Sequence, residues 1–223
     1  MMRFGINSFL LSSGFGNDDL PMIQQFRDWG ADVIELAIHE PEAIDVPALR
    51  RALEQAGMDR VPVCGMFPPA RDLRGSAAQQ QTCRDYLGRL MNLASELGSN
   101  VVCGPFYSSV GRCELLTAAE KQRQADLIAG NLEPLCRQAE RAGIILAMEP
   151  LNRFETDCVN TLEQATALIE QVGSPAFKIH VDTFHMHIEE DNSAAAIRAA
   201  GPDRKSTRLN SSHSQQSRMP SSA

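Results

Sequence analysis

Residues 141–150 read Arg-Ala-Gly-Ile-Ile-Leu-Ala-Met-Glu-Pro, and this stretch decides the fold of the chain. An amphipathic pattern over Ala118–Ala142 predicts a long helix, and Gly143 follows it as a C-terminal capping glycine. The run Ile144–Glu149 is almost continuously apolar, which is typical of a strand buried on both faces of a parallel sheet. The stretch therefore predicts a helix followed at once by a buried strand, as in parallel α/β folds.

The same alternation extends in both directions from this stretch. Strands are expected over Phe4–Phe9, Asp32–Ile38, Val61–Phe67, Asn100–Phe106, Ile144–Glu149 and Lys178–Phe184. Amphipathic helices are expected over Leu20–Trp29, Pro47–Ala56, Cys83–Leu97, Ala118–Ala142, Leu162–Val172 and Ser193–Ala200. The expected capping residues are Gly30, Gly57, Gly98, Gly143, Gly173 and Gly201 after the helices, and Asp18, Asp45, Thr117 and Asn160 before them.

Six consecutive βα units of about 33 residues each indicate the α/β class, and within it a (β/α)8 TIM barrel. A doubly wound nucleotide-binding sheet fits less well, because no glycine-rich phosphate-binding motif follows the first strand. We expect a C-terminally truncated barrel domain over residues 1–202, with only about six of the eight units present.

Residues 203–223 differ in character from the rest of the chain. They are rich in Ser, Arg and Gln and lack apolar periodicity. Asp203–His213 resembles a translated sequencing adapter, and Ser217–Ala223 matches the continuation of that adapter. We therefore expect a non-native, disordered tail and exclude it from the fold prediction.

The composition limits the possible partners. A formal net charge of −7 argues against an extended nucleic-acid surface, which needs clustered Lys and Arg. No apolar run approaches the ~18–20 residues that span a bilayer, and no signal-peptide pattern opens the chain. The six cysteines include no Cys-x-x-Cys pair, so free thiols are expected rather than a zinc site or disulfides. We expect a cytoplasmic protein that acts on a small molecule, without nucleic-acid or membrane partners.

Two carboxylates stand at the ends of neighbouring expected strands. Glu149 ends the fifth strand, and Asp182 lies at the corresponding place on the sixth. The carboxyl ends of barrel strands carry the active sites of this fold, and two carboxylates there can share a divalent cation. Without a positive charge between them, their proximity would be unfavourable. The structural alternative for Glu149 is an ion pair with an arginine across the barrel mouth.

Two further polar residues follow these carboxylates. Glu155 lies six residues beyond Glu149, and His185 lies three beyond Asp182. Either residue alone would fit a solvated surface position. Their coincidence with the two strand-end carboxylates favours a site, in which they are suited to holding sugar hydroxyls.

The remaining conspicuous residues are expected to serve mainly structural roles. Trp29 is expected in an outer hydrophobic contact, Glu35 as a hydrogen-bonded barrel residue, and His39 as a possible lining of the mouth. His187 is expected to face solvent or to lie behind the site, and no chemistry is assigned to Glu189 or Glu190. An apolar wall for the carbon chain of a substrate is expected from Cys64, Met66, Phe67, Phe106 and Tyr107.

The two polar motifs together resemble those of a known family. Residues 149–155 read Glu-Pro-Leu-Asn-Arg-Phe-Glu, and residues 182–190 read Asp-Thr-Phe-His-Met-His-Ile-Glu-Glu. Both resemble signatures of the ketose 3-epimerases, the D-tagatose/D-psicose 3-epimerase group of the sugar-phosphate isomerase/epimerase TIM-barrel superfamily. The resemblance runs from Met2 to about Gly201, and it departs at His187, where the family often has Asn.

This resemblance implies an isomerase that inverts C3 of a free ketose through an enediolate, with Mn²⁺, Co²⁺ or Mg²⁺ as cofactor. It makes Glu149 a metal ligand and one of two acid/base residues, and Asp182 a second ligand. It makes Glu155 and His185 contacts of the sugar near O1 and O2. Homodimers or homotetramers are also implied.

The family pattern further includes a histidine ligand and an arginine near strand seven, and a glutamate after strand eight. None of these is matched here, and His213 belongs to the expected tail. We therefore expect the intact parent to be an epimerase and this chain to be inactive. The open alternatives are a hydroxypyruvate isomerase, an inosose dehydratase, or a fragment without catalytic function. A related barrel nuclease is disfavoured by the acidic charge balance.

Overall fold

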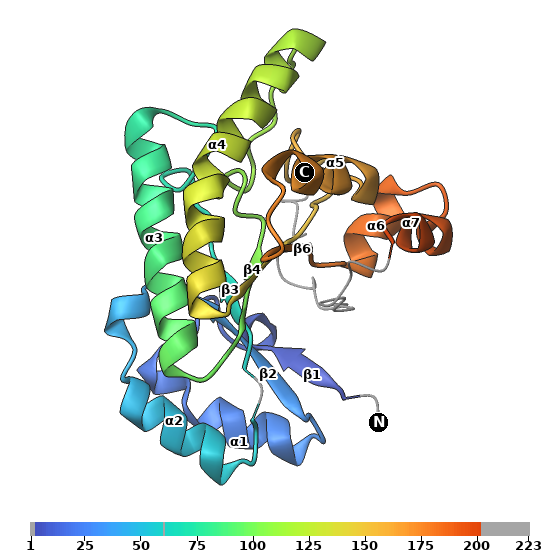
Figure 1. Cartoon of the computed structure of the whole chain (residues 1–223). Helices are drawn as coiled ribbons and strands as arrows, with labels where there is room; N and C mark the ends of the chain where they lie inside the picture. Colours follow the sequence, from blue (N-terminus) through green and yellow to red (C-terminus); the bar gives the residue numbers. More distant parts are fainter. Residues whose placement is uncertain (1–2, 60, 202–223) are drawn as a thin grey trace, which may run out of the picture.

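The computed structural model describes residues 3–59 and 61–201. The strands of this part form one six-stranded parallel sheet in chain order (Figure 1). They are β1 (Gly5–Asn7), β2 (Val33–Ile38), β3 (Val63–Gly65), β4 (Val101–Gly104), β5 (Ile145–Met148) and β6 (Phe177–Ile179). Each strand pairs in parallel with the next one along the chain. The segment between two strands carries the chain back to the end of the sheet at which the first strand began.

Seven α-helices occur among the described residues. They are α1 (Pro21–Asp28), α2 (Val46–Gln55), α3 (Ala77–Glu96), α4 (Ala118–Ala142), α5 (Leu162–Val172), α6 (Thr183–Glu189) and α7 (Ser193–Ala199). Short 3-10 helices are formed by Ser8–Leu10, Asn17–Asp19 and Pro41–Ala43. The long helices α3 and α4 pack side by side, and α7 contacts both α5 and α6 (Figure 1).

The alternation of side chains gives the sheet two different faces. Val63, Val102 and Leu146 are neighbours in register and belong to the large apolar core that the sheet shares with the helices. The positions that alternate with them carry small side chains, which form a separate inner cluster of Ala37, Cys64, Cys103 and Ala147. These four residues are consecutive register partners, so they form one layer across four strands.

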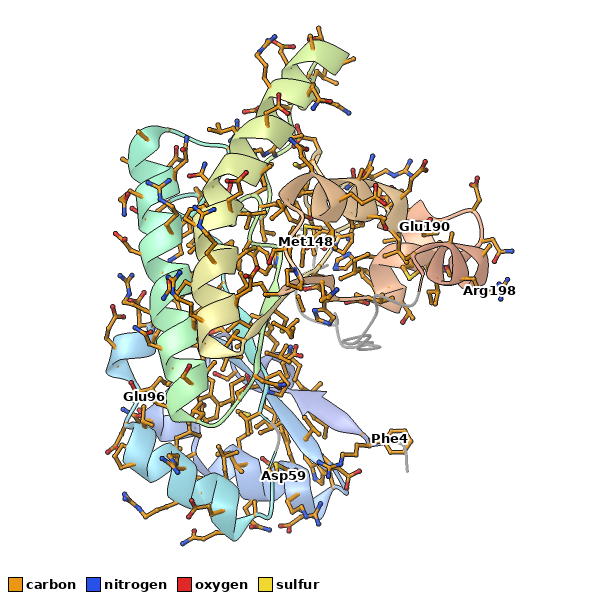
Figure 2. All side chains as sticks on the ribbon, viewed as in Figure 1. Phe4, Asp59, Glu96, Met148, Glu190 and Arg198 are labelled. Atoms are coloured by element: carbon orange, nitrogen blue, oxygen red, sulfur yellow. The ribbon has the colours of Figure 1, made fainter. Side chains whose placement is uncertain are left out.

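The two ends of the sheet also differ. Asp59 and Glu96 precede β3 and β4, and they lie at one end of the sheet. Met148, the last residue of β5, lies toward the other end (Figure 2). The residues that follow the strands therefore gather at a common end, the end that carries active sites in barrels built of βα units.

Helix boundaries follow the expected capping chemistry with two shifts. Asp45 and Thr117 cap α2 and α4 as expected, and Gly143 ends α4 with a left-handed φ of 67°. Thr161 caps α5 in place of the expected Asn160, because its hydroxyl accepts the N–H of Gln164. Asp18 caps no α-helix and lies instead in a 3-10 turn, so the prediction for this residue was wrong.

Several expected segments differ from the structure. The first strand ends at Asn7 rather than Phe9, because Ser8–Leu10 form a 3-10 helix. Helix α3 begins at Ala77 rather than Cys83, because Ser76 and Gln79 form a reciprocal capping box ahead of it. The sixth strand ends at Ile179 and does not reach Phe184. Asp182 instead accepts the N–H of Phe184 and starts helix α6, so the motif that begins at Asp182 is mostly helical.

Glu35 and Trp29 have the structural roles that were expected of them. Glu35 accepts a hydrogen bond from Asn7 at 2.7 Å, and Trp29 packs against Phe26 with 5.5 Å between ring centroids. All six cysteines are free thiols. No helix among the described residues is long and apolar enough to cross a membrane. The expected tail, residues 203–223, lies outside the described residues.

Candidate active site

Three polar side chains from the predicted set meet beyond the carboxyl ends of β5 and β6. Glu149 directly follows β5, Asp182 is the N-cap of α6, and His185 lies in the first turn of that helix. One donor atom from each lies within 4.8 Å of the others, and all three residues are buried. Two adjacent buried carboxylates form a donor set that suits a hard or borderline divalent cation, and the imidazole lies beside them.

The local structure explains how Asp182 presents one oxygen to this cluster. Its Oδ1 atom accepts the N–H of Phe184 at 2.7 Å and thereby caps α6. Its Oδ2 atom lies 3.9 Å from Nε2 of His185, on the side of the cluster. One oxygen therefore fixes the carboxylate, and the other faces His185 in the cluster.

The orientation of His185 is set by Asn152. The backbone N–H of Asn152 donates to Nδ1 of His185 at 3.1 Å, so that nitrogen must carry a lone pair. In the neutral ring the proton is then assigned to Nε2, which lies 4.0 Å from Oε1 of Glu149. A protonated Nε2 cannot coordinate a metal through a lone pair, and it is instead a donor directed at the cluster.

Glu155 belongs to the same arrangement. Its Oε1 atom accepts a hydrogen bond from Nδ2 of Asn152 at 2.9 Å, and the residue is half-buried. Asn152 is therefore shared between Glu155 and His185, the two residues expected to hold a sugar. Sequence reasoning missed Asn152, although the short spacing within Glu149–Glu155 was a signal that the loop folds back on itself.

His180 was also missed. It is 1% exposed, and its Nδ1 atom lies 3.8 Å from Oε2 of Glu149. Neither of its ring nitrogens has a hydrogen-bond partner among the described residues. Its position two residues before Asp182 was the available signal, because residues two apart in an extended segment point to the same side.

A pocket of about 240 Å³ opens beside this cluster. Glu149 and Glu155 contribute its acidic lining, and His39 also lies at its wall. Much of the remaining wall is apolar and includes Phe9, Cys64, Met66, Phe67, Pro68 and Leu151. A pocket with carboxylates on one wall and apolar groups on another can hold a polyhydroxylated molecule against a hydrocarbon surface.

The predicted apolar wall is correct for β3 and wrong for β4. Phe106 and Tyr107 are fully buried in the large core rather than in the pocket lining. Phe106 packs there against Phe67 and Phe177, with 6.3 and 6.0 Å between ring centroids. Pro105 and Val110 line the pocket from the loop after β4 instead.

A buried ionic network connects the loops that surround the site. The Arg74 side chain donates to Oγ of Ser108 at 2.9 Å and to the carbonyl of Arg112 at 3.1 Å, and it pairs with Asp157. Arg112 in turn pairs with buried Asp72 at 3.0 Å. The network therefore joins the loops after β3, β4 and β5.

The electrostatics of Asp157 follow from this network. Burial opposes its ionisation, but the hydrogen bonds from Arg74 and from the Glu114 N–H, with the charge of Arg74, outweigh that effect. The pKa of Asp157 therefore lies below its ordinary value. The contacts of the Asp157 carboxylate therefore fix the position of the loop that carries Glu155.

The last residues of the second motif have structural contacts. His187 is exposed. Glu189 pairs with Arg153 at 3.0 Å, and Glu190 accepts the N–H of Leu162 at 2.7 Å. These contacts hold α6 against the loop after β5 and against the start of α5.

A parallel sheet of βα units, with carboxylates and imidazoles beyond its strand ends, defines a TIM-barrel protein with a candidate metal-dependent active site. Comparison with protein families is consistent with this class. The chain belongs to the xylose isomerase-like TIM barrel family, whose model matches residues 23–219. The expected TIM-barrel fold is thereby confirmed.

Individual relatives agree with the resemblance found in the two motifs. L-ribulose 3-epimerase of Mesorhizobium japonicum is 32% identical over 203 residues, which cover 90% of this chain and 67% of that protein. Ketose 3-epimerase of Arthrobacter globiformis is 29% identical over 201 residues, covering 88% and 67%. The recognised group, the ketose 3-epimerases within an isomerase barrel family, is thereby confirmed. The chain spans about two thirds of the length of these relatives.

Solved structures give the same result. The structure of an L-ribulose 3-epimerase superposes with a TM-score of 0.82 at 30% identity, covering 91% of this chain and 68% of the other. A D-allulose 3-epimerase from Methylomonas sp. in complex with D-allulose superposes with a TM-score of 0.82 at 25% identity, covering 90% and 69%. These relatives are carbohydrate epimerases, which belong to the isomerases.

Proposed function

We propose that the intact protein is a metal-dependent ketose 3-epimerase, which inverts C3 of a free ketose by removing and returning a proton. The observation that carries the proposal is the meeting of Glu149, Asp182 and His185 at the end of the sheet where barrels carry their active sites. Relatives named ketose 3-epimerase and L-ribulose 3-epimerase support the same reaction.

The residues present fit a divalent metal ion. Glu149 and Asp182 supply two buried carboxylates on adjacent segments, and a cation between them would offset their repulsion. Mn²⁺, Co²⁺ or Mg²⁺ suits oxygen-rich sites of this kind. When bound, such an ion would stabilise negative charge that develops on the substrate oxygens as the proton leaves.

The residues of the chain would supply the proton transfer and the contacts with the sugar. A carboxylate oxygen of Glu149 would accept the proton from C3. The C3–H group is too weakly acidic to lose this proton without a nearby base. The Nε2–H of His185 donates a hydrogen bond to a sugar oxygen, since Asn152 holds the opposite nitrogen as an acceptor. Glu155 accepts from a hydroxyl near the same end, and the apolar residues of β3 contact the carbon chain.

The assignment of Glu149 is tested with Glu149→Gln in the complete protein. This change keeps the size of the side chain and removes its basicity, so exchange of the C3 hydrogen with solvent deuterium should fall by at least about 100-fold. His187→Gln, at an exposed position on the neighbouring helix, serves as the control and should retain exchange. Retained exchange in Glu149→Gln would remove Glu149 from this role.

Two related reactions are separated by their substrates. A hydroxypyruvate isomerase or an inosose dehydratase would use the same barrel and metal chemistry. A panel of free ketoses, hydroxypyruvate and an inosose distinguishes these activities, and we expect turnover with the ketoses. The relatives that carry sugar substrates in their names favour a small-molecule ketose over a nucleic acid as the partner.

The oligomeric state and the missing part of the barrel are also proposed. We propose a homodimer or homotetramer for the intact protein, as the resemblance implies. Residues 203–223 are proposed to be foreign, so that a histidine ligand and a second acid/base glutamate come from further βα units. The 223-residue chain alone is then expected to give no turnover.

A further inference from the structure

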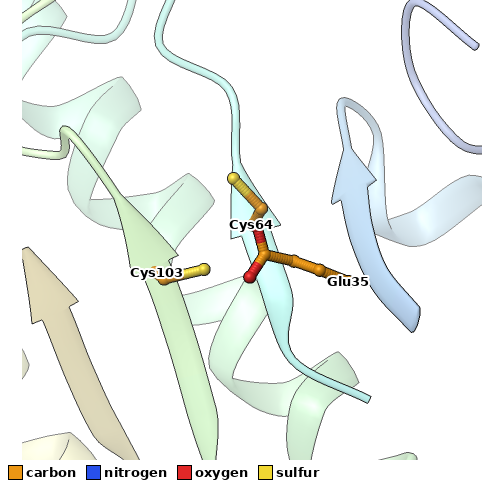
Figure 3. Close-up of side chains that lie close together, drawn as sticks. All are labelled: Glu35, Cys64 and Cys103. Atoms are coloured by element: carbon orange, nitrogen blue, oxygen red, sulfur yellow. The ribbon is translucent and has the colours of Figure 1, made fainter. Parts of the chain in front are cut away.

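A second cluster of potential ligands lies inside the sheet, where Cys103 is the register partner of Ala147, two residues before Glu149. Glu35 on β2, Cys64 on β3 and Cys103 on β4 each place one donor atom within 4.8 Å of the other two. Their exposed fractions are 7%, 5% and 0%. Figure 3 shows the Glu35 side chain extending toward the two cysteines, with its carboxylate near their side chains.

Strand register explains why these residues meet although they are far apart in sequence. Cys64 and Cys103 are register partners on adjacent parallel strands and lie in the same inner layer of the sheet. Glu35 lies two residues before Ala37, the register partner of Cys64, so it occupies the same face. The sequence has no Cys-x-x-Cys pair, and this argued against a metal site. The argument holds for ligands close together in sequence, but not for ligands that the pairing of strands brings together.

The carboxylate of this cluster is held in a fixed orientation. Nδ2 of Asn7 donates to Oε1 of Glu35 at 2.7 Å, and Asn7 is itself the register partner of Glu35 on β1. Such an outer hydrogen bond is the usual means of orienting a carboxylate ligand. Four successive strands therefore contribute to one local arrangement.

The donor chemistry differs from that of the Glu149 cluster. Two thiolates with one carboxylate favour borderline and soft ions, whereas two carboxylates favour hard ions such as Mg²⁺ and Mn²⁺. Zinc bonds are about 2.3 Å to sulfur and about 2.0–2.2 Å to oxygen, so the donors of one ion lie closer together than 4.8 Å, the distance within which these three donor atoms lie. Small side-chain rotations would bring the three donors within bonding distance of one ion.

We propose that Glu35, Cys64 and Cys103 form a second metal site, which takes a thiophilic divalent ion such as Zn²⁺ or Cd²⁺. On binding, each thiol loses its proton to solvent as its sulfur–metal bond forms, and a water molecule completes a tetrahedral set. Cys64 also lines the pocket beside Glu149 and Glu155, so the bound ion would lie next to the substrate pocket. The ion is thus expected to act as an inhibitor of the proposed epimerase.

The other cysteines are not positioned to form a comparable metal site. Among the described residues, Cys136 and Cys158 belong to no group of three donor atoms as close as these. Cys83 lies in the large core, with its Sγ atom 3.9 Å from the carbonyl of Phe106. Cys113 is exposed and is the matched control for a readily accessible cysteine.

The test is a titration of the 223-residue chain with Cd²⁺, followed by the ultraviolet charge-transfer absorption of thiolate–cadmium bonds. We expect one ion per chain, loss of the band in Cys64→Ser and in Cys103→Ser, and an unchanged band in Cys113→Ser. Glu35→Gln should keep a sulfur band and weaken binding by roughly tenfold or more. Excess Mn²⁺ should not displace the ion.

A second measurement uses the unaltered chain and does not depend on the folding of any variant. Alkylation of thiols followed by mass spectrometry should show that Cd²⁺ protects Cys64, which lines the pocket, but leaves Cys113 reactive. The proposal is overturned if no band forms, if the band survives in Cys64→Ser, or if Cd²⁺ protects Cys113 in place of Cys64. Neither measurement uses catalytic activity, so the result is independent of the proposed epimerase reaction.

Discussion

At the scale of single residues, the site depends on side chains that perform two tasks at once. Asp182 caps α6 with one oxygen and directs the other toward His185. Asn152 orients His185 and Glu155 together. Strand-end position in the sequence was enough to find Glu149 and Asp182. It could not find Asn152 or His180, because their importance comes from contacts between loops that no local pattern encodes.

The double task of Asp182 gives a prediction that separates folding from metal binding. Asp182→Asn keeps a good helix cap but loses the charge, so it should weaken Mn²⁺ binding strongly and change the free energy of unfolding little. Asp182→Ala loses both functions and should be less stable by about 1 kcal/mol. Calorimetric Mn²⁺ titration and urea unfolding measure the two effects. Equal stability of the two variants would contradict the capping role.

At the scale of structural elements, the fold is assembled from βα units whose boundaries follow local capping. Helices α4 and α5 occupy the residues expected from their apolar periodicity and their glycine caps. The end of β6 was mispredicted, because Val181 continues the apolar pattern of the strand while Asp182 already caps a helix. The loop network around Arg74 was not predicted, since it joins residues up to 83 positions apart.

Arg74 should matter to stability far more than a surface arginine. Its buried side chain pairs with Asp157, and Arg74→Met would leave that carboxylate without its main partner, which typically costs about 3–5 kcal/mol. The control is Arg137→Met, which breaks an exposed helix pair with Glu133 and should cost less than about 1 kcal/mol. Urea unfolding of both variants provides the comparison, and similar losses would contradict a special role for the network.

The lowered pKa of Asp157 predicts a pH dependence with a definite sign. A carboxyl whose pKa is lower in the folded state stabilises the fold above its unfolded pKa, which is about 3.9. This stabilisation is lost as the pH falls through the folded pKa. Asp157→Asn should therefore be less stable than the unaltered chain at neutral pH, and the difference should shrink below about pH 4. A difference in unfolding free energy that stays constant across this range would contradict the assignment.

At the scale of the whole molecule, the described residues form a sheet whose order begins at β1 and ends at β6. The chain spans about two thirds of the length of these relatives, and its described residues form six strands of a fold that has eight. The periodicity of the sequence was sufficient to predict this architecture, because repeated βα units leave few topologies open. The inner cluster of Glu35, Cys64 and Cys103 could not be predicted, because it depends on register between strands.

The central claim is that the Glu149 cluster belongs to a metal-dependent ketose 3-epimerase. The most direct measurement is nuclear magnetic resonance of D-fructose, D-tagatose and L-ribulose in deuterium oxide. The protein for this measurement is translated from its source gene beyond the codon for Gly201, and it is assayed with Mn²⁺ and with a chelator. The account predicts deuterium only at C3, formation of the C3 epimer, loss of exchange with the chelator, and no exchange by the 223-residue chain. Exchange at C1, or C3 exchange that is unaffected by the chelator, would contradict it.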